Sequence, residues 1–106
     1  MPFETQMKRD LHFQKHGVQL GAADAATYET LADAFMSGLM NSTTRECHRP
    51  NRGNRLRFDT FNLRFGAESV GPPSYLKTFF IVNQATINYH GNELRYFGYE
   101  CGRINA

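Results

Sequence analysis

The sequence has no tryptophan, only two cysteines and three lysines, and no long apolar run. No segment approaches the roughly 20 apolar residues of a membrane-spanning helix, so we expect no membrane partner. No charged-then-apolar leader opens the chain, and we expect any export to depend on elements outside this sequence. A length of 106 residues fits one domain over 1–106, with a helical part at about 5–41 and a sheet part at about 43–103.

The cysteines, Cys47 and Cys101, lie far apart and fit no metal-binding spacing. They can pair with each other, or both can remain buried thiols. A chain with so few cysteines lacks the density of a disulfide-stapled domain. We therefore expect free thiols.

Positive charge is modest overall but locally concentrated in arginine. The formal net charge is +2 and the pI about 8.7, and arginine outnumbers lysine nine to three. Guanidinium groups suit bidentate contact with phosphate, although a solvated loop with scattered charge explains the cluster equally well. Six arginines fall within twenty positions: Arg45, Arg49, Arg52, Arg55, Arg57 and Arg64.

The first forty residues predict two helices. The first, over 5–16, would bury Met7 and Leu11, with Val18 extending that face. Gly17 would end this helix in the left-handed conformation. The second helix is predicted over 25–40 with Asp24 as its N-cap. Its apolar residues recur at helical spacing: Tyr28, Leu31, Ala32, Phe35, Met36 and Leu39.

The rest of the chain predicts strands. Most of the nine Phe and five Tyr lie after residue 57, which indicates an aromatic-rich sheet. The expected strands are 43–50, 55–61, 62–69 and 75–82, with breaks at 51–54 and 71–74. A turn at 90–92 would join 85–89 and 93–101 in a terminal hairpin. Strands that follow helices favour an α+β domain, with two N-terminal helices packed on one face of an antiparallel sheet of four to six strands. The other face would be free for a ligand.

Two histidines, His12 and His16, lie one helical turn apart and would share a face of the first helix. Such a pair can bind zinc if a third ligand joins it. His48 and His90 are possible third ligands, although nothing in the sequence requires either of them. It can also transfer protons, because imidazole titrates near neutrality. A purely structural role, with one surface histidine and one at the helix end, is the third alternative.

Mid-strand polar residues leave further alternatives. Lys77 and Thr78 cannot both face the core, because successive strand residues point to opposite faces. Thr78 either fills a position beside Leu76 and Phe80 or presents its hydroxyl on the open face. Asp59 and Asn62 flank a turn, and we expect both to be structural.

Taken in order, residues 11–81 resemble the barnase/EndoU/colicin/RelE-like (BECR) ribonuclease domains of bacterial polymorphic and contact-dependent inhibition toxins. The shared pattern is a His-Gly helix end, a second helix with Tyr and Ala-x-x-Phe, a strand ending in Asp, an Asn-x-x-Phe-Gly segment and a Leu-x-Thr-x-Phe strand. These positions are His16, Gly17, Tyr28, Ala32, Phe35, Asp59, Asn62, Phe65, Gly66, Leu76, Thr78 and Phe80. The segment 70–74 makes a stiffer turn than the family's, and 87–106 has no counterpart, so it would add strands or line the cleft.

The resemblance implies a metal-independent endoribonuclease without a cofactor. Its substrate would be RNA, with tRNA expected, and 2′-hydroxyl attack on the adjacent phosphate would leave a 2′,3′-cyclic phosphate. His12 and His16 would be general base and acid in unassigned order, with a slight preference for His16 at the cleft. The expected catalytic set is His12, His16, Arg57 and Thr78, and the expected substrate-binding set is Arg55, Lys15, Lys77 and Tyr75.

The resemblance also implies partners and a place of action. We expect a cognate immunity protein, acidic in charge, delivery by a secretion or contact-dependent system, and action in the cytoplasm of a target bacterium. A non-catalytic RNA- or phosphate-binding module on the same fold is the alternative. An immunity or adaptor protein would require an acidic strand region, which the arginine cluster disfavours.

Overall fold

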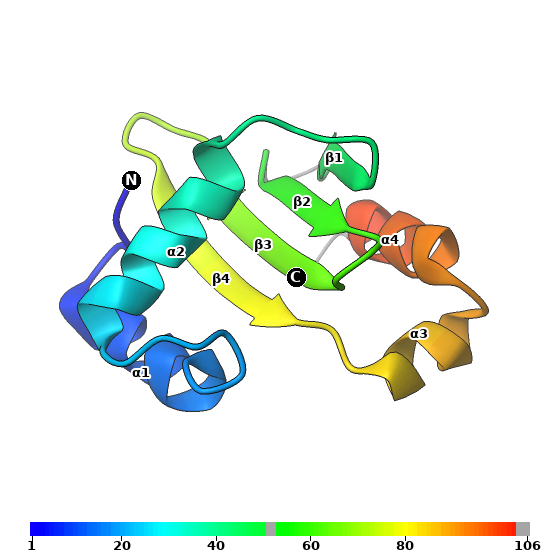
Figure 1. Cartoon of the computed structure of the whole chain (residues 1–106). Helices are drawn as coiled ribbons and strands as arrows, with labels where there is room; N and C mark the ends of the chain where they lie inside the picture. Colours follow the sequence, from blue (N-terminus) through cyan, green and yellow to red (C-terminus); the bar gives the residue numbers. More distant parts are fainter. Residues whose placement is uncertain (51–52, 104–106) are drawn as a thin grey trace.

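A computed structural model describes residues 1–50 and 53–103 and has the predicted α+β fold (Figure 1). The four strands form one antiparallel sheet in the order β1-β2-β3-β4, and each lies within its predicted range. Helices α1 and α2 pack on one face, with α1 beside the edge strand β4. The elements are α1 (Gln6–His16), α2 (Ala25–Ser37), β1 (Thr44–His48), β2 (Arg55–Asp59), β3 (Arg64–Ser69), β4 (Tyr75–Ile81), α3 (Gln84–His90) and α4 (Glu93–Gly102).

Helix α2 begins and packs as its sequence predicts. The Asp24 carboxylate accepts a hydrogen bond from the Thr27 backbone N–H at 2.7 Å, which confirms the N-cap. Every fourth residue is fully buried against the sheet: Tyr28, Ala32 and Met36. The helix ends at Ser37, earlier than predicted, and Leu39 is therefore exposed instead of extending the apolar stripe.

Helix α1 packs differently from its prediction. Met7, Leu11 and Val18 are exposed, whereas Phe13 packs against the core under α2. Gly17 ends the helix with a right-handed φ of −59°, so the expected left-handed cap is wrong. Glycine is required there for space, because a Cβ would lie 2.4 Å from the Phe13 ring.

Two turn predictions concern the loops between strands. Asp59 accepts the backbone N–H groups of Phe61 and Asn62, which confirms its structural role. In the predicted turn at 51–54, Gly53 has a φ of 65°. Positions 51–52, and with them Arg52, lie outside the described residues.

The predicted terminal hairpin is wrong, because its two halves form helices α3 and α4. The Asn92 side chain caps α4 by accepting the Arg95 backbone N–H at 2.9 Å. Helix α4 lies on the sheet face opposite α2 (Figure 1), where Phe97 stacks on Phe58 with ring centroids 5.7 Å apart. The face expected to be free is therefore partly covered, and hollows remain beside β4.

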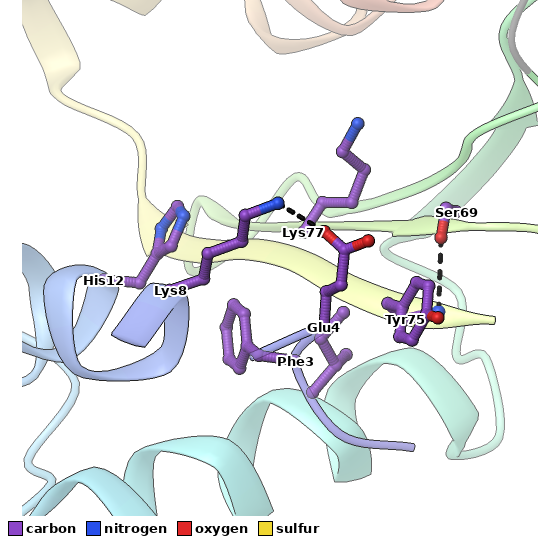
Figure 2. Close-up of a pocket in the computed structure, with 8 residues that line it drawn as sticks. Phe3, Glu4, Lys8, His12, Ser69, Tyr75 and Lys77 are labelled. Atoms are coloured by element: carbon purple, nitrogen blue, oxygen red, sulfur yellow. Dashed lines mark hydrogen bonds and ion pairs between the residues drawn. The ribbon is translucent and has the colours of Figure 1, made fainter. Parts of the chain in front are cut away.

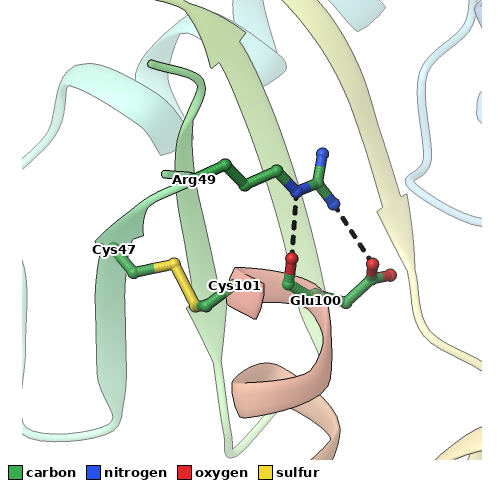
Figure 3. Close-up of a disulfide and its surroundings, with 4 residues drawn as sticks. All are labelled: Cys47, Arg49, Glu100 and Cys101. Atoms are coloured by element: carbon green, nitrogen blue, oxygen red, sulfur yellow. Dashed lines mark hydrogen bonds and ion pairs between the residues drawn. A yellow bond between two sulfur atoms is a disulfide. The ribbon is translucent and has the colours of Figure 1, made fainter. Parts of the chain in front are cut away.

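The two cysteines form a disulfide, so the prediction of free thiols is wrong. Cys47 on β1 and Cys101 on α4 have Cα atoms 6.1 Å apart (Figure 3). Low cysteine density does not exclude a disulfide, because one cross-link needs only two cysteines. The disulfide ties the end of α4 to the edge strand β1.

A β-bulge in the β3–β4 pair decides where the polar residues of β4 face. Leu76 pairs with Glu68 and Thr78 with Ala67, which leaves Lys77 as the extra residue. Leu76 lies in the core under α2, whereas Thr78 lines a hollow on the α4 side of the sheet. The bulge thus separates the faces of Leu76 and Thr78, which regular alternation would have joined.

Candidate functional site along strand β4

Three hollows adjoin along β4, and we call them together the β4 groove. The His12 hollow, of about 450 Å³, lies between α1 and the start of β4. The Thr78 hollow, of about 310 Å³, lies between β3, β4 and the end of α4. The His16 hollow, of about 500 Å³, lies at the end of β4 beside α3 and α4. Lys77 lines the first two hollows, and Phe80 and Glu100 line the last two.

The His12 hollow combines an imidazole with two lysines. The His12 ring stacks on Phe3 with centroids 5.4 Å apart. Its Nδ1 is buried and has no hydrogen-bond partner among the described residues. Figure 2 shows Lys8 beside His12 in an ion pair with Glu4, while Lys77 extends from β4 with its ammonium clear of that pair. Tyr75 and Lys77 line this hollow as well, so two predicted substrate-binding residues meet there.

His16 lines the His16 hollow, and its ring centroid lies 6.1 Å from that of His12. The predicted shared helical face is therefore confirmed. The His16 ring stacks on Phe80 of β4 at 5.2 Å. Burial is the main reason that the pKa of each imidazole lies below its ordinary value, and the nearby Lys15 lowers both further. Both rings are therefore largely neutral at pH 7 and able to accept a proton.

These lowered pKa values predict a pH-dependent stability. Between pH 6.5 and the folded pKa values the unfolded chain binds more protons, so the free energy of unfolding falls as the pH falls through that window. Urea unfolding from pH 7.5 to 5 measures this fall. The His12→Phe variant keeps a ring against Phe3 but cannot titrate. Its free energy of unfolding should therefore fall less between pH 7.5 and 5 than that of wild type. Equal losses would contradict the burial of a neutral His12.

The Thr78 hollow contains a network of charged groups centred on Glu100. Arg49 donates from Nε to the Glu100 carbonyl at 2.9 Å and from Nη2 to its carboxylate at 3.2 Å (Figure 3). Tyr96 donates its hydroxyl to the other carboxylate oxygen at 2.9 Å. Arg103 also donates to this carboxylate, yet its side chain remains 42% exposed. Arg103 is thus an accessible guanidinium in the β4 groove.

Arg55 and Arg57, expected to hold the phosphate, lie elsewhere. Arg57 is buried and donates to the carbonyls of Phe35 at 2.9 Å and Gly38 at 2.6 Å, at the end of α2. Arg55 donates to Glu68, and both arginines also donate to Glu46. Their guanidinium groups are occupied on the α2 side of the sheet, whereas Thr78 faces α4. The structure therefore corrects their placement in the site.

The remaining predicted residues divide between groove and surface. The structure brings His16 and Thr78 to neighbouring hollows that share Phe80. Lys15 is exposed on α1 and lines none of the three hollows. Sequence reasoning missed Arg103 and Glu100, because it predicted a terminal hairpin where Glu100 lies on α4 and Arg103 directly follows that helix. It considered His90 only as a metal ligand, although His90 lines the His16 hollow.

The sequence matches no family model, and no curated protein is similar enough to match it. The resemblance to BECR ribonuclease domains therefore stays a prediction from the quoted motifs. Five of the motif residues line the β4 groove: His16, Phe65, Leu76, Thr78 and Phe80. Gly66 serves packing, since a Cβ there would lie 2.6 Å from the Met36 sulfur.

The zinc alternative required a third ligand near His12 and His16. His48 lies exposed on β1, whereas His90 lines the hollow beside His16. Over residues 1–50 and 53–103, no three His, Cys, Asp or Glu side chains gather in a way that could hold a metal ion.

Over the same residues, no helix has the length and apolar character needed to cross a membrane.

The structural role of Arg57 gives a stability prediction. Arg57→Ala should lower the free energy of unfolding by about 2–3 kcal/mol, because buried acceptors at the end of α2 lose a charged donor. Urea unfolding at pH 7 measures the change. Arg45→Ala is the matched control, because Arg45 is exposed on the same sheet, and it should change stability by less than about 0.5 kcal/mol. Equal effects of the two substitutions would contradict this role.

Proposed function

We propose that the protein is a metal-independent endoribonuclease that cuts RNA, with tRNA as the expected substrate. The observation that carries the proposal is the gathering of a neutral imidazole, a hydroxyl and two cations along one edge strand: His16, Thr78, Lys77 and Arg103. RNA supplies its own nucleophile, the 2′-hydroxyl. The protein must accept that proton, stabilise charge on the phosphate oxygens and let the 5′-oxygen leave.

The groups of the β4 groove match these tasks. His16 accepts the 2′-hydroxyl proton, since burial keeps its imidazole neutral at pH 7. Thr78, Lys77 and Arg103 donate hydrogen bonds to the phosphate oxygens, where charge develops in the transition state. His12, in the adjoining hollow, contacts the flanking nucleotide together with the lysines there.

The proposal extends to a partner and a place of action. Exposed cations along the β4 groove suit an acidic immunity protein that covers it, because opposite charges speed association. The protein would be delivered by a secretion or contact-dependent system and would cut RNA in the cytoplasm of a target bacterium. These statements rest on the motif similarity and the charge of the groove.

Incubation of micromolar protein with total bacterial RNA in EDTA tests the activity. We expect fragments that end in 2′,3′-cyclic phosphate, and no cut at a mapped site whose nucleotide is replaced by its 2′-deoxy form. RNA that stays intact while the protein binds it would replace the enzyme with the RNA-binding alternative. Cleavage abolished by EDTA would contradict the metal-independent mechanism.

A further inference from the structure

Two helices from different parts of the chain each end in a histidine at the same hollow. His16 is the last residue of α1 and His90 the last residue of α3. Both line the His16 hollow of about 500 Å³, which falls within the usual range of about 300–1,000 Å³ for ligand sites. Figure 1 places α1 and α3 on either side of the end of β4. The hollow is thus lined by one imidazole from each of two separate helices.

His90 is held by aromatic rings. Its ring stacks on Tyr99 with centroids 4.6 Å apart and an interplanar angle of 26°. Tyr96 and Tyr89 contact it edge-on at 5.5 and 5.2 Å. These aromatic contacts fix the orientation of the His90 ring at the hollow. Gly91, with a φ of 103°, allows the chain to turn away directly after His90.

The two sides of the hollow matter because the attacking and leaving oxygens of a phosphate displacement lie roughly in line on opposite sides of phosphorus. A base and an acid must then approach from opposite sides as well. His12 and His16 project from one face of one helix and approach from the same side. His90 lines the His16 hollow from a different helix, whereas His12 lines another hollow, so His90 is better placed than His12 to protonate the leaving oxygen.

We propose that His90 is the general acid of the cleavage reaction, paired with His16 as the base. The inference rests on the proposed ribonuclease function. The 2′-oxygen forms a bond to phosphorus while its proton passes to His16. The bond from phosphorus to the 5′-oxygen breaks while the His90 imidazolium gives that oxygen a proton. The products are a 2′,3′-cyclic phosphate and a free 5′-hydroxyl.

Two forms of one RNA oligonucleotide test this role, with oxygen or sulfur bridging to the 5′-carbon at the mapped cut site. A thiolate leaves without a proton, so only the oxygen form needs the acid. We expect His90→Ala to lower kcat about 10²–10⁴-fold on the oxygen form and less than about 10-fold on the sulfur form. His16→Ala should slow both forms. His90→Asn repeats the test with a polar side chain, and circular dichroism verifies that each variant is folded.

The outcomes separate the two proposals. Equal losses on both forms, or no loss on the oxygen form, would overturn the role of His90 and leave the ribonuclease function standing. The acid would be His12 instead if His12→Ala lowered kcat on the oxygen form alone and His90→Ala left kcat on that form unchanged. A wild-type protein that cuts neither form would overturn both proposals. His48→Ala, exposed on β1, should match wild type on both forms.

Discussion

His16→Ala is expected to cleave RNA with a kcat about 10²–10⁴-fold below that of wild type, the usual contribution of one positioned acid–base group. The physical reason is that the lowered pKa of His16 keeps a proton acceptor ready at pH 7, in a hollow shared with Phe80 and Glu100. Alanine removes the acceptor and leaves the cationic groups of the groove in place. A fluorogenic RNA oligonucleotide at saturating concentration measures kcat directly.

His48→Ala is the matched control, because it removes an exposed imidazole at the opposite edge of the sheet. It should retain the wild-type kcat. If both substitutions had the same effect, or if His16→Ala changed only KM, the imidazole of His16 would not take part in the chemical step. The assignment of the base would then fail.

Loss of the disulfide is expected to lower the free energy of unfolding by about 4 kcal/mol. The estimate follows from the loop of unfolded chain closed by Cys47 and Cys101, which are separated by 54 positions. That amount is a large share of the stability of a small domain, about 5–15 kcal/mol. Urea unfolding of the Cys47→Ser, Cys101→Ser double variant, compared with oxidised wild type, measures the loss.

The disulfide also supports the groove, because Glu100 adjoins Cys101 and bonds to Arg49 two residues beyond Cys47 (Figure 3). Wild type treated with a reductant should resemble the double serine variant, and the same reductant should leave that variant unchanged. A loss below about 1 kcal/mol in both cases would show that β1 and α4 stay docked without the cross-link.

The sequence predicted those elements whose local signals agree with their packing. Helix α2 has an N-cap at Asp24 and an apolar stripe, and both signals lead to the same buried face. The strands alternate as expected up to Lys77, where a bulge overrides the period of two. The C-terminal segment failed because Tyr96 and Phe97 favour strands by residue type, while their burial together with Glu100 has helical spacing.

The candidate site was predictable only in part for the same reason. His16 and Thr78 belong to elements whose position followed from the sequence, and both border the groove. The arginine cluster suggested a phosphate site, yet the Arg57 guanidinium donates its hydrogen bonds to backbone carbonyls at the end of α2. The groove also contains His90, at the end of α3, and Arg103, which directly follows α4. No local sequence pattern predicts how these C-terminal helices dock on the sheet.

The most direct test of the account follows the imidazole NMR signals of the four histidines while an RNA oligonucleotide with 2′-fluoro groups is added. This RNA lacks the 2′-hydroxyl and cannot be cut, so the bound state persists. RNA bound in the β4 groove should shift the signals of His12, His16 and His90, while that of His48 on β1 stays unchanged. Bound RNA that shifts His48, or that leaves the three groove histidines unmoved, would contradict it.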